Sequence, residues 1–136
     1  MTEPLLPHRG EALFLRDVTS FDARSVAAVA SVPRGSCYAS EGRAEALLAI
    51  ELAAQAAAAH AASTGSRIGE REAAGLLVGV KELRLRVATF PCDEEVTVSA
   101  SLEGRAQQLA IWRFEVACAS VGVIASGTLS VWQDGA

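Results

Sequence analysis

Residues 44–64, AEALLAIELAAQAAAAHAAST, decide how the rest of the chain must fold. Alanine and leucine are strong helix formers, and no glycine or proline occurs before Gly65, which suits the position just after a helix end. A helix that is apolar on nearly every side is a core element. The stretch therefore predicts one long buried helix, against which the other elements must pack.

Three polar side chains interrupt this helix: Glu51, Gln55 and His60. A carboxylate among alanines and leucines is costly to bury without a reason, so Glu51 is the first candidate for a functional residue. At about 100° per residue, Gln55 follows Glu51 by one turn and lies about 40° from it round the helix. His60 points to the opposite face. Glu51 and Gln55 can therefore share a site that His60 cannot join from the same helix.

Length and charge narrow the class of protein. The chain has 136 residues, a net charge of -4 and a pI near 5.2. This length predicts a single domain over residues 1–136, large enough to bury a substantial core. Nucleic-acid binding needs a concentrated basic face, and arginine and lysine form no long cluster here, so we expect no nucleic-acid partner.

The cysteines and the N-terminal sequence indicate the cellular compartment in which we expect the protein. Cys37, Cys92 and Cys118 are odd in number and show no C-x-x-C spacing, a pattern that predicts a reducing cytoplasm and no structural metal. Residues 1–10, MTEPLLPHRG, carry an acid and two prolines and no apolar core, so we expect no secretory signal. An acid at the centre of a spanning helix costs about 2.5–3.5 kcal/mol on insertion scales, so we expect no membrane span.

The sequence on both sides of the helix predicts strands, which gives an α+β fold. These runs are rich in β-branched and aromatic residues and are separated by turn-forming residues. The expected strands are residues 12–22, 24–32, 76–87, 95–102, 109–119 and 121–131. An antiparallel sheet with one apolar face must cover that face, and the long helix is the candidate that can do so. We therefore expect a sheet of about five or six strands that curls round the helix.

The sequence also predicts the positions of two loops and the direction of the side chains in one strand. Residues 34–43 are predicted to form a loop that leads into the helix, with Ser40 as its cap, and residues 66–75 an exposed loop. In residues 81–86, KELRLR, the alternation predicts that Leu83 and Leu85 face the core and the charged residues face the solvent. The charged face is interpreted as solvated, with a docking point for an anionic partner as the alternative.

Three segments resemble a known enzyme family. LLPHRGEALFLRDV (residues 5–18) resembles the N-terminal signature of FabZ-type 3-hydroxyacyl-[acyl-carrier-protein] dehydratases, and IELAAQAAA (residues 50–58) resembles their E-x-x-A-Q helix. GLLVGVKELRLRVATFPCDEEVTV (residues 75–98) resembles dehydratase-like proteins found with aryl polyene biosynthesis genes. The resemblance implies a hotdog fold, in which a curved antiparallel β-sheet wraps around one long central helix.

In FabZ-type enzymes the catalytic pair is a histidine in an HFPG loop and a glutamate on the helix, one from each subunit of a dimer. The resemblance places Glu51 at the glutamate position and Gln55 at that of the motif glutamine. The histidine position falls on Cys37, followed by Tyr38 where the family has phenylalanine, and the HFPG motif is absent. Elimination of water needs one group to remove the α-proton and another to protonate the leaving hydroxyl. The resemblance therefore leaves open which residue is the second group.

The alternatives for each candidate residue are these. Cys37 can act if its thiolate is stabilised near a helix N-terminus, and is otherwise an ordinary small loop residue. His8 belongs to the lead-in motif, where capping or packing is the alternative to catalysis. His60, on the far helix face, is interpreted as a satisfied or surface histidine. Glu51 is interpreted as a site carboxylate, with a buried acid paired to a loop amide as the alternative.

These observations lead to one main hypothesis and two alternatives. The main hypothesis is a dehydratase-like protein acting on 3-hydroxyacyl thioesters of acyl carrier protein or coenzyme A, with Glu51 as acid/base and Gln55 orienting the substrate or a backbone group. The alternatives are a hotdog thioesterase, in which Glu51 activates water, and a non-catalytic subunit that pairs with an active dehydratase or holds an acyl chain. No metal or redox cofactor is implied.

The resemblance also bears on assembly and on rate. Because the resembling families complete each site between two subunits, we expect a homodimer or larger assembly, with a heterodimer containing a second hotdog dehydratase as the alternative. Because the family's histidine position is occupied by Cys37, we expect the isolated chain to dehydrate its substrate weakly or not at all.

Overall fold

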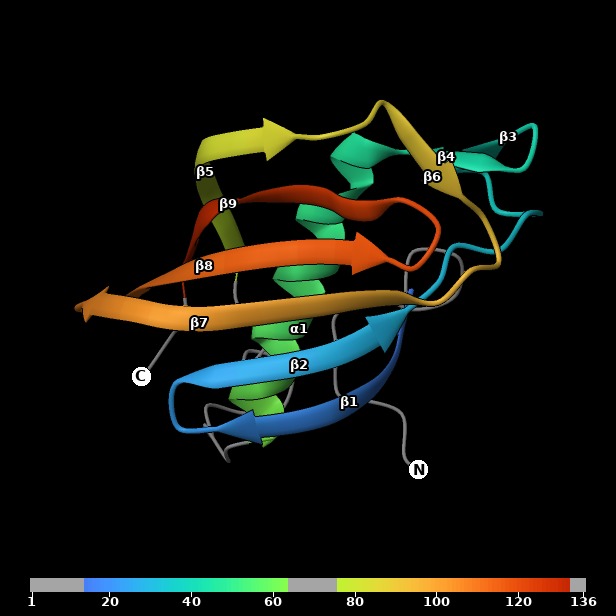
Figure 1. Cartoon of the computed structure of the whole chain (residues 1–136). Coiled ribbons are helices and arrows are strands. Elements are labelled where there is room, and N and C mark those ends of the chain that lie inside the picture. The colour runs from blue at the N-terminus through green and yellow to red at the C-terminus, as the bar shows by residue number, and fades with distance from the viewer. Residues whose placement is uncertain (1–13, 64–75, 133–136) are drawn as a thin grey trace.

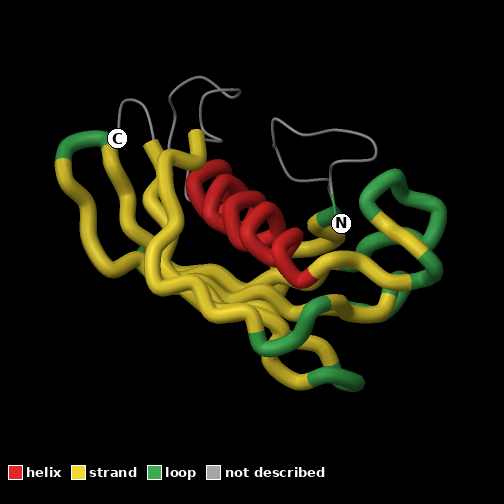
Figure 2. Tube along the Cα trace, turned by 90° about the horizontal axis from the view of Figure 1, so that it is seen from above, coloured by secondary structure: helices red, strands yellow, loops and turns green. Residues whose placement is uncertain are grey.

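A long helix lies against the inner face of a curved antiparallel sheet (Figure 1). The computed structural model describes residues 14–63 and 76–132. The strands of this sheet are β1 (Leu15–Asp22), β2 (Ser25–Ala30), β5 (Leu76–Leu85), β7 (Val96–Ala106), β8 (Leu109–Cys118) and β9 (Gly122–Trp132). They form a six-stranded sheet in the order β1-β2-β7-β8-β9-β5, which confirms the expected number of strands. Figure 2 shows the sheet curling round the helix.

The predicted strands are confirmed within a few residues of their expected ends, with one clear extension. β7 continues to Ala106, beyond the predicted end at Leu102. A register shift between Leu102 and Gly104 keeps its pairing with β8, and the turn follows at Gln107, whose φ is 59°. The stretch around Gly104, which suggests a turn in the sequence, is therefore a bulge within a longer hairpin.

The helix begins later than predicted. α1 (Ala49–Ser63) follows a 3₁₀ turn, η2 (Ala46–Leu48), and a short strand, β4 (Arg43–Glu45). Residues 44–48 have good helix propensity, but pairing of β4 with a distant strand overrides it. Glu51 therefore lies in the first turn of α1 rather than in its middle, where a carboxylate interacts favourably with the helix dipole. The predicted end of the helix at Thr64 and Gly65 lies outside the described residues.

A second, three-stranded sheet was not expected from the sequence. It has the order β3-β4-β6 and is formed by β3 (Ala39–Ser40), β4 and β6 (Thr89–Pro91), beside the N-terminal end of the helix (Figure 1). The prediction of a loop over residues 34–43 holds for residues 34–38 and was wrong for residues 39–43, which form a hairpin. The prediction of Ser40 as a cap was also wrong, because Ser40 pairs with Arg43. Glu41 and Gly42 form its turn with φ values of 53° and 76°, as a two-residue hairpin turn requires.

The core is filled mainly from the sheet. The buried apolar residues of α1 are alanines apart from Leu52, whereas the largest buried side chains, Trp112 and Phe114 of β8 and Phe90 of β6, come from strands. Small side chains let the helix approach the sheet closely, and the aromatic rings fill the space that remains. The interpretation of the helix as a core element is confirmed. None of the helices in the described part of the chain is long and apolar enough to cross a membrane.

The alternation predicted for residues 81–86 fails at a β-bulge. Glu82 has a φ of 55°, and the register between β5 and β9 shifts at this point. Leu83 is partly buried against the core, but Leu85 is 45% exposed. The prediction that both leucines face the core was wrong for Leu85, because one extra residue in a strand exchanges the faces of the side chains that follow.

Candidate active site

Glu51 and Gln55 meet, as their helical spacing predicts. Nε2 of Gln55 donates a hydrogen bond to Oε2 of Glu51 at 3.1 Å. The two residues lie one turn apart on α1, so the helix itself brings the amide under the carboxylate. Glu51 is partly buried, whereas Gln55 is only 1% exposed. The buried amide thus supports a carboxylate that still reaches the surface.

The other end of the Gln55 amide fixes its orientation. Oε1 accepts hydrogen bonds from the backbone N–H groups of Phe14 and Leu15, both at 3.2 Å. An oxygen that faces two N–H donors leaves the NH₂ end to face an acceptor, here the Glu51 carboxylate. The expectation that Gln55 orients a backbone group therefore has a structural counterpart, since it ties α1 to the start of β1.

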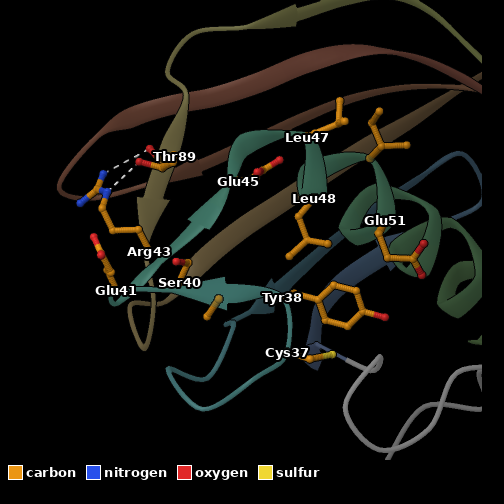
Figure 3. Close-up of a pocket in the computed structure, with 12 residues that line it drawn as sticks. Cys37, Tyr38, Ser40, Glu41, Arg43, Glu45, Leu47, Leu48, Glu51 and Thr89 are labelled. Carbon is orange, nitrogen blue, oxygen red and sulfur yellow. Dashed lines mark hydrogen bonds between the residues drawn. The ribbon is translucent and has the colours of Figure 1, made fainter.

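Glu51 opens onto a pocket with a volume of about 780 Å³, within the usual range for small-molecule sites. The pocket lies between the N-terminal end of α1 and the small sheet (Figure 3). Its apolar lining comes from η2 and the first turn of α1, namely Leu47, Leu48 and Ile50. Its remaining lining is Cys37, Tyr38, Ala39, Ser40, Glu41, Arg43, Glu45, Glu51 and Thr89. The cavity therefore offers an apolar surface next to a carboxylate.

The polar rim of the pocket is held by hydrogen bonds across the small sheet. Nε of Arg43 donates to Oγ1 of Thr89 at 2.7 Å, and a second guanidinium nitrogen donates to the Thr89 carbonyl at 3.2 Å. The dashed lines in Figure 3 mark this pair of contacts. The guanidinium is thereby fixed at the pocket edge on β4, rather than extended freely into solvent.

Cys37 and Tyr38 lie in the same pocket as Glu51. Cys37 is exposed, and none of the three cysteines forms a disulfide. The ring of Tyr38 packs edge-on against Phe14, with ring centroids 5.5 Å apart and an angle of 87°. The sequence drew attention to Tyr38 only as a departure from a motif, and it gave no sign that the tyrosine ring lines the site.

The structure describes one of the two histidines, His60, and not the other. His8 lies outside the described residues. His60 is buried, and its Nε2 lies 2.8 Å from the Asp22 carbonyl oxygen. A carbonyl only accepts, so Nε2 carries the hydrogen. His60 also packs edge-on against Trp112 at 4.9 Å, which confirms its placement away from the Glu51 pocket.

Two further facts concern a buried cysteine outside the pocket lining and the capacity of the described residues to bind a metal ion. Burial raises the pKa of the Cys92 thiol, and the neighbouring Asp93 carboxylate acts in the same direction, so this cysteine stays protonated near neutral pH. Within residues 14–63 and 76–132, no group of histidine, cysteine, aspartate and glutamate side chains is arranged to hold a metal ion.

Comparison with known proteins places the chain in a family. The sequence model of the ApeP-like family, described as ApeP dehydratase, matches residues 1–135. The chain belongs to the ApeP-like dehydratase family. The resemblance drawn from three sequence segments is thereby confirmed. A search of curated proteins finds no match to this ApeP-like chain.

Solved structures confirm the hotdog fold. The dehydratase heterocomplex ApeI:P from Xenorhabdus doucetiae is similar over 99% of this chain and 93% of that one, with a TM-score of 0.84 and 22% identity. A hypothetical thioesterase with coenzyme A from Streptococcus pneumoniae TIGR4 is similar over 85% and 83%, with a TM-score of 0.64 and 11% identity. AziG of S. sahachiroi is similar over 88% and 90%, with a TM-score of 0.60 and 20% identity. At these identities the likeness defines the fold alone.

Proposed function

We propose that this ApeP-like protein is a dehydratase subunit acting on 3-hydroxyacyl thioesters carried by acyl carrier protein or coenzyme A. The observation that carries the proposal is the Glu51 carboxylate, held by a buried glutamine and open to a pocket with an apolar lining. Membership of a dehydratase family supports the same reaction class. The aryl polyene or fatty-acid pathway is proposed from the sequence resemblance.

In this reaction the α C–H bond and the β C–O bond break, a C=C bond forms, and water leaves. Glu51 is proposed to accept the α-proton. Gln55 is a positioning residue, because its amide bonds to two backbone N–H groups and fixes the carboxylate in one direction. Such fixing matters, since a misplacement of about 1 Å can cost a factor of 10² in rate. The apolar side chains of η2 and α1 suit the acyl chain of the substrate.

A second acid/base group is required, and Cys37 and His8 are the candidates from the sequence. General acid/base catalysis is typically worth about 10²–10⁴ in rate per group, so a chain with Cys37 at the histidine position is proposed to turn over slowly alone. The ApeI:P assembly is a heterocomplex, which supports a second hotdog chain as the partner. That partner is proposed to contribute its own histidine to a composite site.

The open ends of the large sheet support assembly. β1 and β5 lie at its two edges, and within the described chain each pairs with one neighbour in the sheet. β5 also exposes Leu77, Val78 and Leu85. An edge strand with exposed apolar side chains gains from pairing with another chain. Sedimentation that gives only a 14.1 kDa species at micromolar concentration contradicts the proposed dimer.

Mass spectrometry of carrier-bound substrates tests the function. The purified chain is incubated with 3-hydroxyacyl and acyl forms of acyl carrier protein, alone and with a second hotdog dehydratase whose own glutamate has been replaced. Loss of water, weak alone and stronger in the mixture, is the expected result. A rate alone near that of a FabZ-type enzyme contradicts the partner's role, and no loss of water under either condition contradicts the proposed function.

Thioester hydrolysis is the second candidate function. It is favoured by the likeness of fold to a thioesterase with coenzyme A. In this case Glu51 activates a water molecule towards the thioester carbonyl, and the acyl group leaves its carrier. The same assay separates the two reactions, because hydrolysis removes the carrier from both 3-hydroxyacyl and acyl substrates, whereas dehydration changes only the first.

A further inference from the structure

The Tyr38 hydroxyl is placed to reach a molecule bound in the pocket. Tyr38 lines the pocket and is 47% exposed, although its ring is anchored on the buried ring of Phe14. Within residues 14–63 and 76–132, the structure shows no hydrogen bond to this hydroxyl. The N–H of Tyr38 donates to Oγ of Ser36 at 3.1 Å, which fixes the backbone from which the ring projects.

The same support holds Tyr38 and Glu51. The ring of Phe14 contacts Tyr38, and the backbone N–H of Phe14 donates to the glutamine that holds Glu51. Figure 3 shows the phenol and the Glu51 carboxylate at the same end of the pocket. Two groups that share one rigid support keep a constant separation, which is what a reaction needing an acid and a base at one substrate requires.

We infer that Tyr38 is a catalytic residue of the proposed dehydration, its phenol donating a hydrogen bond and then a proton to the 3-hydroxyl of the substrate. The inference rests on the proposed function of the Glu51 pocket. The α-proton passes to Glu51. The C–O bond breaks as the hydroxyl takes the phenol proton and leaves as water. The proton on Glu51 then passes to the phenolate, which restores both side chains. Atoms and charges balance without an oxidant, a reductant or a cofactor.

The other hydroxyl groups of the pocket are less suited to this role. Oγ1 of Thr89 accepts the hydrogen bond of Arg43, and Ser40 is an alkyl alcohol on the small sheet. Phenols belong to the side chains that act as general acids, whereas alkyl alcohols are much weaker acids. A phenol is also a weaker acid than an imidazolium ion near neutral pH, which agrees with the slow turnover proposed for the isolated chain.

Equilibrium binding tests the inference without turnover. Glu51→Gln protein is titrated with 3-hydroxyoctanoyl-pantetheine and octanoyl-pantetheine, and the same titrations are made with Glu51→Gln/Tyr38→Phe. A hydrogen bond from Tyr38 to the 3-hydroxyl gives the first protein a preference of about two- to tenfold for the hydroxylated probe. Tyr38→Phe keeps the ring on Phe14 and should erase that preference.

Thr97→Val in the Glu51→Gln background is the matched control. It also deletes one hydroxyl, on β7, which donates to the Ala117 carbonyl and lies outside the pocket lining. The preference should persist in this control. A preference that survives Tyr38→Phe, or none in the parent, overturns the role of Tyr38 even where dehydration itself is observed.

A turnover measurement on the isolated chain completes the test, because no partner histidine can supply the proton there. Tyr38→Phe in otherwise wild-type protein should lower kcat by about 10²-fold or more, with an unchanged melting temperature. A kcat close to that of the wild type overturns the inference. Failure of the protein to dehydrate in any assembly contradicts the proposed function instead, and the binding preference then still decides whether Tyr38 recognises the hydroxyl.

Discussion

The two sheets of this protein differ in strand length and in what they contribute to the molecule. The six-stranded sheet has long strands with alternating buried and exposed residues, and it packs on an alanine-rich helix. The three-stranded sheet has strands of two or three residues, joined by a two-residue turn and braced by Arg43. The first supplies most of the buried core, whereas the second supplies much of the pocket rim. We therefore expect stability to depend mainly on the large sheet and activity on the small one.

Trp112→Ala should have the largest effect on stability. Trp112 is fully buried on β8 against His60, and its removal leaves a cavity, so the free energy of unfolding should fall by about 3–5 kcal/mol. Tyr38→Ala removes a half-exposed ring beside the small sheet and should cost about 1 kcal/mol or less. Denaturant-induced unfolding measures both. Equal losses would remove the distinction between the two regions.

Gly42→Ala should have an intermediate effect, confined to the pocket region. Gly42 has a φ of 76°, and a Cβ there would collide with the guanidinium of Arg34. The left-handed conformation costs a non-glycine residue about 1–2 kcal/mol, so unfolding free energy should fall by roughly that amount while substrate binding weakens. Gly35→Ala is the matched control, since a Cβ added at Gly35 would meet no atom within 4 Å and the φ of this residue is not positive. A loss of the same size in the control contradicts this explanation.

Glu94 should give the smallest effect, a stabilisation that is present near neutral pH and lost in acid. It joins the chain after β6 to the turn between β8 and β9, accepting hydrogen bonds from Oγ and N–H of Ser120 at 2.7 and 2.9 Å. These bonds hold the pKa of the Glu94 carboxyl below its usual range. A lowered folded pKa stabilises the protein above the ordinary glutamate pKa of about 4.3, and this stabilisation is lost as pH falls through the folded value.

Glu94→Gln should therefore flatten the pH dependence of unfolding free energy below about pH 4.3. Ser120→Ala should flatten it only in part, because it removes the Oγ donor and keeps the backbone N–H. Adding Ser120→Ala to Glu94→Gln should change the slope little, because the carboxylate that both donors contact is already absent. Unfolding curves at a series of acidic pH values measure the effect. An unchanged slope in both variants would show that Ser120 does not perturb Glu94 in solution.

The large sheet could be predicted from the sequence because its signals are local. Alternation marks β7 and β8, and alanine content marks the interior of α1, so their existence and faces follow from short windows of sequence. The Glu51–Gln55 contact is local too, since one helical turn separates the residues. These are the parts in which propensity, periodicity and tertiary structure agree.

The small sheet and much of the site could not be predicted because they depend on distant partners. β4 pairs with β6, and this pairing delays the helix start that propensity favours. The backbone partners of Gln55, Phe14 and Leu15, come from the beginning of the described chain. The bulge at Glu82 likewise has no marker such as glycine, so Leu85 appears in the sequence as a core residue.

Substitution of Glu51 by glutamine tests the central claim that this carboxylate is a catalytic base held by Gln55. Glu51→Gln keeps the side-chain volume and an acceptor for the Gln55 amide but removes the base. In the assembly that dehydrates 3-hydroxyacyl thioesters, turnover should fall by about 10²–10⁴-fold while the melting temperature stays within a few degrees of the wild type. Retained turnover together with a loss of several kcal/mol in unfolding free energy, the mark of a structural buried charge pair, would contradict the claim.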